Sequence, residues 1–172
     1  LQCLVRNSHD HLCKTFHRVI VGDIRDPAAV NEATRGVDIV LHFAAAVHSR
    51  VSEDQYKPIN IEGTENLARA AAANGVDHFI FASSVSVYGS GSMSFNEGSP
   101  CQPDTAYGQS KLIGEQKLEA IAKETGMSTT ILRLSTVYGE GEPGNVSRLI
   151  RTIAKYGPIV VGDGLNRKSM TY

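Results

Sequence analysis

Asp38-Ile-Val-Leu-His-Phe-Ala44 is apolar almost throughout, which is typical of a β-strand that is covered on both of its faces. His78-Phe-Ile-Phe-Ala-Ser83 and Thr129-Thr-Ile-Leu-Arg-Leu-Ser135 are two later runs of the same kind. Short β-branched and aromatic runs separated by longer stretches favour a parallel sheet with helices packed on it. These three runs therefore predict three strands of such a sheet.

Strands and amphipathic stretches also alternate before, between and after these three runs. Further strands are expected over residues 1–6, over residues 18–23 and from residue 158. Helices are expected over residues 27–35, 53–74, 105–124 and 146–156. Asp26 and Pro27 supply a cap and a first-turn proline for the first helix, and Pro58 predicts a kink or a late start in the second. The alternation predicts parallel pairing through right-handed crossovers, so we expect an α/β fold with a doubly wound, Rossmann-type sheet.

The composition argues against several classes of function. A net charge of -1 lacks the basic excess that a nucleic-acid-binding surface needs. No apolar run is long enough to cross a bilayer, and residues 1–6 lack the features of a secretory signal. Three cysteines do not make a disulfide framework and fit a reducing compartment. We therefore expect a cytoplasmic protein without a nucleic-acid or membrane partner.

Cysteine and histidine residues crowd the N-terminal part of the chain, at Cys3, His9, His11, Cys13 and His17. Their spacing matches neither C-x-x-C nor H-x-x-x-H, which are common arrangements in zinc sites. A short strand followed by a polar loop explains them, and no metal site is expected.

The residues with the clearest chemistry are in Tyr107-Gly-Gln-Ser-Lys111. On a helix, Tyr107 and Lys111 are one turn apart on the same face. An ammonium nearby lowers the pKa of a phenol, so the pair can accept the proton of an alcohol. The alternative is an exposed pair without a role. Ser84 follows a predicted strand, where ligands bind in a doubly wound sheet; its alternative role is that of a turn or cap residue.

With these motifs, the chain resembles the extended short-chain dehydrogenase/reductase family, and most closely its nucleotide-sugar epimerase and dehydratase branch. The matching segments follow the family's order along nearly the whole chain. They are Val21-Gly-Asp-Ile-Arg-Asp26, His42-Phe-Ala-Ala45, Asn60-Ile-Glu-Gly-Thr64, Ser83-Ser-Val-Ser-Val-Tyr-Gly89, Tyr107-Gly-Gln-Ser-Lys111, Arg133-Leu-Ser-Thr-Val-Tyr-Gly139 and Gly162-Asp-Gly164. The resemblance implies a partial NAD(P)-binding domain over residues 1–172, in which a substrate-binding region starts at about residue 140.

The resemblance also implies a role for each matched position. Tyr107 is expected to be the catalytic base, Lys111 to bind the nicotinamide ribose and tune Tyr107, and Ser84 to complete the triad. Besides Tyr107 and Lys111, cofactor contacts are expected at Arg6, Asp23, Ile24, Phe43, Ala44, Ala45, Asn60, Leu134 and Ser135. Substrate contacts are expected at Ser84, Thr136, Asn145 and Lys168.

Several of these positions have an alternative interpretation. Asp23 can be a helix cap, Phe43 to Ala45 can be plain buried strand, and Asn60 can make a structural bond inside the kinked helix. Arg6 stands where the family often carries an acidic residue for the adenosine ribose. Since arginine accommodates a 2′-phosphate, the cofactor is left open between NAD and NADP.

The glycine-rich phosphate loop that joins the family's first strand to its first helix is not found at the start of the sequence. We therefore expect the chain to begin at the family's second strand and to be a fragment of a longer protein. In the usual strand order 3-2-1-4-5-6 the missing strand is central, so the strands at Leu1 and Asp38 would lose their shared neighbour. We expect this segment alone to be unstable or inactive.

The expected activity is epimerisation of a nucleotide sugar through a keto intermediate, as in a UDP-glucose 4-epimerase. Two alternatives remain: a reductase of a small carbonyl compound that consumes NADPH, and a non-catalytic dinucleotide-binding module. A dehydratase is disfavoured because Val85 and Ser86 replace an acidic pair. A homodimer formed through the two long helices, over residues 53–74 and 105–124, is possible by analogy with the family.

Overall fold

A computed structural model describes residues 1–7, 16–47, 52–91, 94–141, 144–158, 163, 165 and 168–172. The chain forms two compact units, Leu1–Arg133 and Leu134–Tyr172. Three residues of the N-terminal group, His9, His11 and Cys13, lie outside the described residues. Most of the strand expected from residue 158 also lies outside them.

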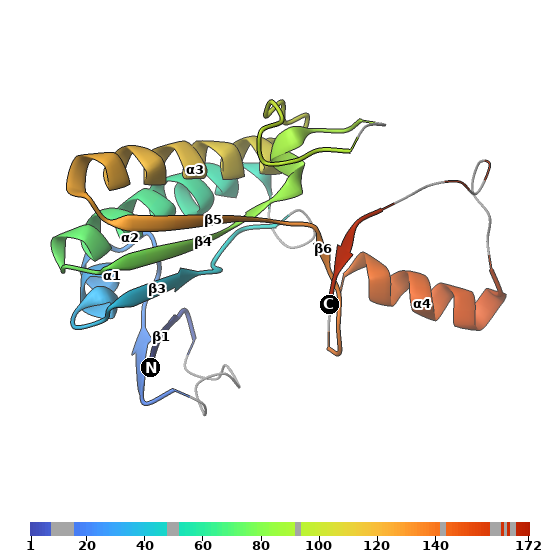
Figure 1. The fold of residues 1–172 in the computed structure, drawn as a ribbon. Helices are drawn as coiled ribbons and strands as arrows, with labels where there is room; N and C mark the ends of the chain where they lie inside the picture. Colours follow the sequence, from blue (N-terminus) through green and yellow to red (C-terminus); the bar gives the residue numbers. More distant parts are fainter. Residues whose placement is uncertain are drawn as a thin grey trace. The chain divides into compact units, whose positions relative to one another are not determined.

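The first unit alternates strands and helices in the expected order (Figure 1). Its strands are β1 (Gln2–Val5), β2 (Arg18–Val21), β3 (Ile39–His42), β4 (His78–Ser84) and β5 (Ser128–Leu134), the last of which ends at the unit boundary. Its helices are α1 (Pro27–Thr34), α2 (Gly63–Ala73) and α3 (Ala106–Thr125). Asp26 caps α1 by accepting a hydrogen bond from the Ala28 amide, as its place before Pro27 predicts.

The helix expected over residues 53–74 consists of three pieces. A 3₁₀ turn, η2 (Glu53–Gln55), leads into a π-helical turn, η3 (Lys57–Glu62), and only then does α2 begin. Pro58 lies in the π-helical turn, so the late start that it predicts is confirmed. A π-helical turn is rare and is often found at functional sites, which directs attention to the residues that it presents.

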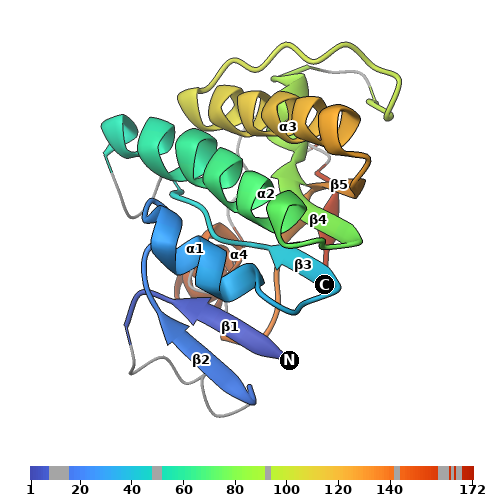
Figure 2. The ribbon, with the colours of Figure 1, turned by 90° about the vertical axis from the view of Figure 1, so that its left-hand side faces the viewer.

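The sheet of the first unit is split into two parts. β1 and β2 pair in parallel, with Gln2 opposite Arg18 and Val5 opposite Val21. The other part has the order β3-β4-β5, and β3 is parallel to β4. Figure 2 shows β1 and β2 lying beside each other, separate from β3 and β4. Among the described strands β1 and β3 are thus not neighbours.

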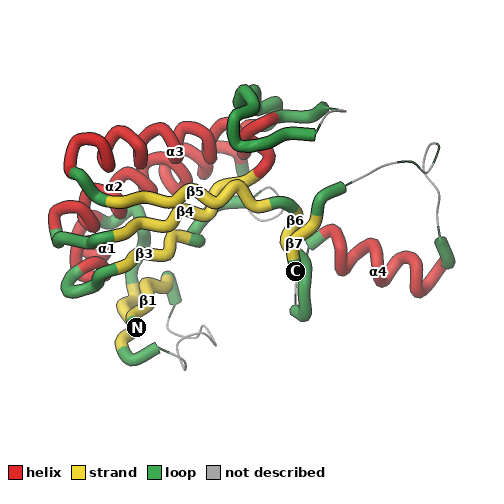
Figure 3. The backbone as a smooth tube through the Cα atoms, in the orientation of Figure 1, coloured by secondary structure: helices red, strands yellow, loops and turns green. Residues whose placement is uncertain are grey.

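The three helices cover only one face of β3-β4-β5 (Figures 1 and 3). The buried core between them contains Val40, Phe79, Phe81, Leu118 and Ile121. The opposite face of β3 is open: Ile39 is 58% exposed and Leu41 is 56% exposed. Within the described residues this strand is covered on one face only, because every helix described in this unit packs on the same side.

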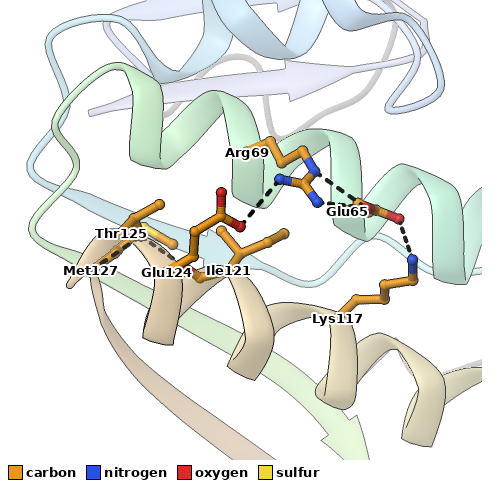
Figure 4. A network of polar contacts seen from close by, with 7 residues as sticks. All are labelled: Glu65, Arg69, Lys117, Ile121, Glu124, Thr125 and Met127. Carbon is orange, nitrogen blue, oxygen red and sulfur yellow. Dashed lines mark hydrogen bonds and ion pairs between the residues drawn. The ribbon is translucent and has the colours of Figure 1, made fainter.

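A surface network of ion pairs joins α2 to α3 (Figure 4). Glu65 on α2 receives Arg69 at 3.1 Å and Lys117 of α3 at 2.9 Å, and Arg69 also reaches Glu124 at 3.7 Å. Exposed pairs of this kind contribute about 0–1 kcal/mol each. The network therefore contributes little to stability, and its main effect is to favour one alignment of α2 along α3.

The second unit contains α4 (Asn145–Tyr156) and two short strands. β6 (Thr136–Val137) pairs in parallel with β7 (Met170–Thr171), with Thr136 opposite Met170. None of the helices in the described part of the chain combines the length and the apolar character needed to cross a membrane.

Candidate functional site

Ser84 is the last residue of β4 and the N-cap of a 3₁₀ turn, η4 (Val85–Tyr88). Its hydroxyl oxygen accepts hydrogen bonds from the Ser86 amide at 3.2 Å and from the Ser86 hydroxyl at 2.9 Å. Ser84 thus has the capping role that is common for a serine at a strand end. Its own hydroxyl proton is not used in either bond, so it can be donated to a ligand oxygen.

Gly108 brings the start of α3 against the turn that Ser84 caps. A Cβ at this position would lie 2.5 Å from the Ser86 carbonyl oxygen and 3.1 Å from the Pro103 side chain. Thr105 fixes the same helix end by capping the Gly108 amide at 3.0 Å. Only glycine permits this close approach, which places Tyr107 next to the Ser84 turn.

Tyr107 is partly buried on the first turn of α3, and its ring lies edge-on to Tyr56, with centroids 6.0 Å apart. Burial raises the pKa of Tyr107, and the neighbouring Tyr56 raises it further. The expectation that Lys111 lowers this pKa is wrong for this structure, because burial of the phenol and the neighbouring Tyr56 raise it. Tyr107 is therefore protonated at neutral pH.

Lys111 is buried, with 2% of its surface exposed, so the alternative of an exposed pair with Tyr107 is wrong. Its ammonium lies 4.3 Å from the centre of the Phe81 ring. Burial lowers the pKa of Lys111 to about 8, and the negative charge of Glu115 opposes this shift. The ammonium is thus charged at neutral pH, although most of the water around it has been removed.

Asn60 joins the chain that leaves β3 to the helix that carries Tyr107. Its side-chain oxygen accepts from the Ala46 amide at 2.7 Å, and its side-chain nitrogen donates to the Ala46 carbonyl at 3.1 Å and to the Ser110 hydroxyl at 2.9 Å. Ser110 in turn donates to the Tyr107 carbonyl at 2.7 Å. These bonds explain why Asn60 is buried and give it a structural role, while its expected contact with the cofactor stays a prediction.

His42 is buried below this network, and its ring stacks on Phe81 with centroids 5.2 Å apart. Thr64 donates to the Asn60 carbonyl at 2.7 Å, so the 2.9 Å contact between Thr64 and His42 requires a proton on Nε2 of His42. Burial lowers the pKa of His42 to about 3, with a smaller contribution from Lys111. His42 is consequently a neutral structural residue.

The expected adenine contacts lie at the ends of β1 and β2. Arg6 is exposed, directly after β1. Asp23 accepts both ends of the Arg25 guanidinium at 2.8 Å, and this bonding lowers the pKa of Asp23 to about 2. Since Asp26 caps α1, the alternative role of Asp23 as that cap is wrong. The side chain of Ile24 belongs to the core, so any contact with a cofactor would come from its backbone.

Phe43 and Ala44 follow β3 and are exposed, Phe43 by 63%. The alternative that they form plain buried strand is therefore wrong. Ala45 is half-buried. Their position at the carboxyl end of a strand is where ligands bind in open parallel sheets.

The remaining expected contacts belong to the second unit. Ser135 shares a hydrogen bond of 2.8 Å with Thr171, and Thr136 lies in β6. Lys168 is exposed, Asn145 begins α4, and Leu134 ends β5. The structure does not place these residues relative to Tyr107, so their roles stay predictions.

Two features of the site were not predicted from the sequence. One is Tyr56, which lies against Tyr107 and stands four residues before Asn60. The other is a buried ion pair between Glu115 and Arg133. The position of Glu115, four residues after Lys111, was a signal for a shared helix face, but its partner could only be found in three dimensions.

Comparison with known proteins agrees with this geometry. The sequence model of the "NAD dependent epimerase/dehydratase family" matches residues 3–172. The chain is 39% identical over 155 residues to N-acetyl-alpha-D-glucosaminyl-diphospho-ditrans,octacis-undecaprenol 4-epimerase of Escherichia coli O157:H7, covering 88% of this chain and 47% of that protein. It is 35% identical over 152 residues to UDP-glucose 4-epimerase of Vibrio cholerae, with 83% and 46% covered.

A solved structure is similar in fold as well as in sequence. UDP-glucuronic acid 4-epimerase of Bacillus cereus, crystallised with UDP-glucuronic acid and NAD, superposes with a TM-score of 0.78 at 31% identity, over 90% of this chain and 51% of that one. This similarity confirms the Rossmann-type α/β fold. The chain spans about half the length of the curated relatives it matches.

Proposed function

Because the chain belongs to the NAD dependent epimerase/dehydratase family, we propose that it carries the catalytic residues for epimerisation of a nucleotide sugar through a keto intermediate, with NAD or NADP as the cofactor. One observation carries this proposal. Tyr107 and Lys111 lie on the same helix, and the Gly108 contact packs that helix on the turn capped by Ser84.

The residues present fit a nicotinamide dinucleotide. Lys111 is a buried ammonium, and no carboxylate of the described residues forms an ion pair with it. Its donors are thus available for ribose hydroxyls, which are uncharged acceptors. Phe43 and Ala44, exposed at the end of β3, allow a ligand to approach the backbone. When bound, the cofactor would accept hydride from the sugar carbon and return it to the other face.

The protein's own residues would handle the proton. Ser84 donates its free hydroxyl proton to the reacting oxygen and orients it. In the small fraction of the protein that carries a Tyr107 phenolate, this oxygen takes the proton from the sugar hydroxyl, becomes the neutral phenol and gives the proton back to the keto oxygen. The charge of Lys111 favours the phenolate that is present before the first step and after the second. The raised pKa of Tyr107 suits the step in which the proton is returned.

The substrate class follows from the relatives. Their names include a UDP-sugar and a sugar linked through a diphosphate to a polyprenol, which share a sugar esterified to a diphosphate. We propose the nucleotide-linked form. A dehydratase activity is disfavoured because Val85 and Ser86 offer no acid or base, and Ser86 already donates to Ser84.

The full-length protein should interconvert UDP-glucose, UDP-N-acetylglucosamine or UDP-glucuronic acid with the corresponding 4-epimer. Product sugars would be separated by chromatography while absorbance of the reduced cofactor is followed. Epimerisation leaves that absorbance unchanged after each turnover. Steady consumption of reduced cofactor, or turnover of the polyprenyl substrate alone, would contradict the proposal.

Tyr107→Phe is the matched variant for the mechanism. It should lower kcat by at least about a thousandfold, because the proton acceptor and donor is lost, while the Kd for the cofactor changes little. Tyr138→Phe, a tyrosine of the second unit without an expected catalytic role, is the control. Full activity of the Tyr107→Phe protein would rule out the proton transfer described above.

A further inference from the structure

Glu115 is a carboxylate that the proposed reaction does not use. It lies one helical turn beyond Lys111 on α3, and 1% of its surface is exposed. Its oxygens receive Nη2 of Arg133 at 2.7 Å and Nε of Arg133 at 3.2 Å, and the Ser83 hydroxyl also donates to it. A buried carboxylate is costly unless it is fully paired in this way.

The partners of Glu115 lie on both sides of Ser84. Ser83 immediately precedes Ser84 in β4. Arg133, near the end of β5, also donates to the Tyr88 hydroxyl at 2.9 Å, and Tyr88 ends the turn that Ser84 caps. Glu115 thus connects the start and the end of the Ser84 turn to the helix of Tyr107 and Lys111.

We propose that Glu115 and Arg133 are positioning residues for the reaction, which hold the Ser84 turn in register with the Tyr107–Lys111 face of α3. This inference rests on the proposed function for its catalytic readout. Glu115 lies on α3 and Arg133 on β5, and the hydrogen bond from Ser83 links Glu115 to β4, directly before Ser84. A helical i,i+4 spacing keeps Glu115 on the same face as Lys111.

The same carboxylate balances charge around Lys111. The titratable groups that interact with the Lys111 charge are Glu115 on α3 and His42 on β3, and Glu115 is also paired with Arg133 on β5. His42 is neutral above about pH 3, so Glu115 is the one negative charge in this set. Without it, the buried Lys111 and the partly buried Arg133 would be two cations without a carboxylate partner among the described residues.

The test is Glu115→Gln in the full-length protein, with Glu119→Gln, an exposed glutamate one turn further along α3, as the matched control. We expect kcat to fall at least tenfold and the alkaline limb of its pH profile to move down by about one pH unit, because Lys111 loses its proton more readily. The control should keep both values. A wild-type kcat and an unmoved limb in Glu115→Gln would overturn the proposal.

A second variant covers the case in which Glu115→Gln does not fold. Glu115→Gln combined with Arg133→Gln leaves neither charge unpaired, and such neutral replacements are often tolerated. The double variant should fold and show a reduced kcat. The alkaline limb of its pH profile should lie closer to the wild-type value than the limb of Glu115→Gln does. Wild-type kcat in the double variant would overturn the positioning role.

An NMR titration of the Lys111 side chain in selectively labelled protein separates this inference from the proposed function. It requires folding but no turnover. A downward shift of the Lys111 midpoint in Glu115→Gln would support the charge role even in a protein that epimerises no sugar, whereas an unchanged midpoint would contradict that role in an active one.

Discussion

Lys111 illustrates how a buried charged side chain can reduce the stability of the protein that contains it. Its pKa is about 8 in the folded protein against 10.5 for an ordinary lysine, so the folded state holds the proton less tightly than the unfolded state. Stability is therefore greatest above pH 10.5 with respect to this group, and is lost as the pH falls through the interval from 10.5 to 8.

Lys111→Met should accordingly stabilise the protein at pH 7 by up to about 3 kcal/mol, because a buried charge is replaced by an apolar chain of similar shape. It should at the same time weaken cofactor binding and abolish turnover. Urea unfolding measures the first effect and cofactor titration the second. Lys123→Met, at an exposed position of α3, should change stability by less than about 0.5 kcal/mol. A destabilised Lys111→Met protein would contradict this prediction.

His42 predicts an opposite limit at acid pH. The pKa of His42 is about 3 in the folded protein and 6.5 for an ordinary histidine. Between these two pH values the unfolded chain therefore binds a proton at His42 and the folded protein does not. Stability is complete above about pH 6.5 and declines by about 1.4 kcal/mol for each pH unit below it, until about pH 3.

His42→Asn, which keeps a donor for Thr64, should remove this part of the slope between pH 6.5 and 4.5. The free energy of unfolding in urea at several pH values would show it. His17→Asn is the control, since His17 is exposed. If the His42→Asn slope equalled that of the wild type, another group would be responsible for the loss of stability in acid.

At the scale of elements, the contact between α3 and η4 decides where Tyr107 lies. The contact depends on Gly108, beside which there is no room for a methyl group. In an exposed helix, alanine in place of glycine would add about 1 kcal/mol of stability. Here the clash with the Ser86 carbonyl outweighs that gain.

Gly108→Ala should therefore destabilise the protein by about 1–3 kcal/mol and lower kcat at least tenfold, with KM less affected. Thermal unfolding and steady-state kinetics of the full-length protein measure these effects. Gly139→Ala is the matched control for stability, because nothing lies within 4 Å of the Cβ that it adds. A Gly108→Ala protein with unchanged kcat would show that the helix start can shift without consequence.

At the scale of the first unit, the sheet has one buried and one open face. Phe79 on β4 is fully buried against the helices, whereas Leu41 on the neighbouring β3 is half-exposed on the open face. Phe79→Ala should cost about 3–5 kcal/mol, and Leu41→Ala less than about 1 kcal/mol. Urea unfolding of both variants tests this, and equal losses would mean that the open face is covered in solution.

Much of this architecture could be predicted from the sequence. Alternating runs predicted the strands, and Asp26-Pro27 predicted the start of α1. The Tyr107–Lys111 spacing predicted a shared helix face. The burial of Lys111, the pKa of Tyr107 and the pairing of Glu115 with Arg133 could not be predicted, because each depends on side chains that are brought together by packing between distant segments.

The π-helical turn at Lys57–Glu62 limits which sequence changes, and above all which deletions, this segment can tolerate. Its hydrogen bonds close over five residues rather than four, so it holds a residue that an α-helix of the same span would lack. Loss of one residue there would rotate the preceding chain by about 100° around the helix axis. Asn60 could then no longer meet both Ala46 and Ser110. Substitutions at the exposed positions of this turn should therefore be tolerated, whereas deletion of one of its residues should not.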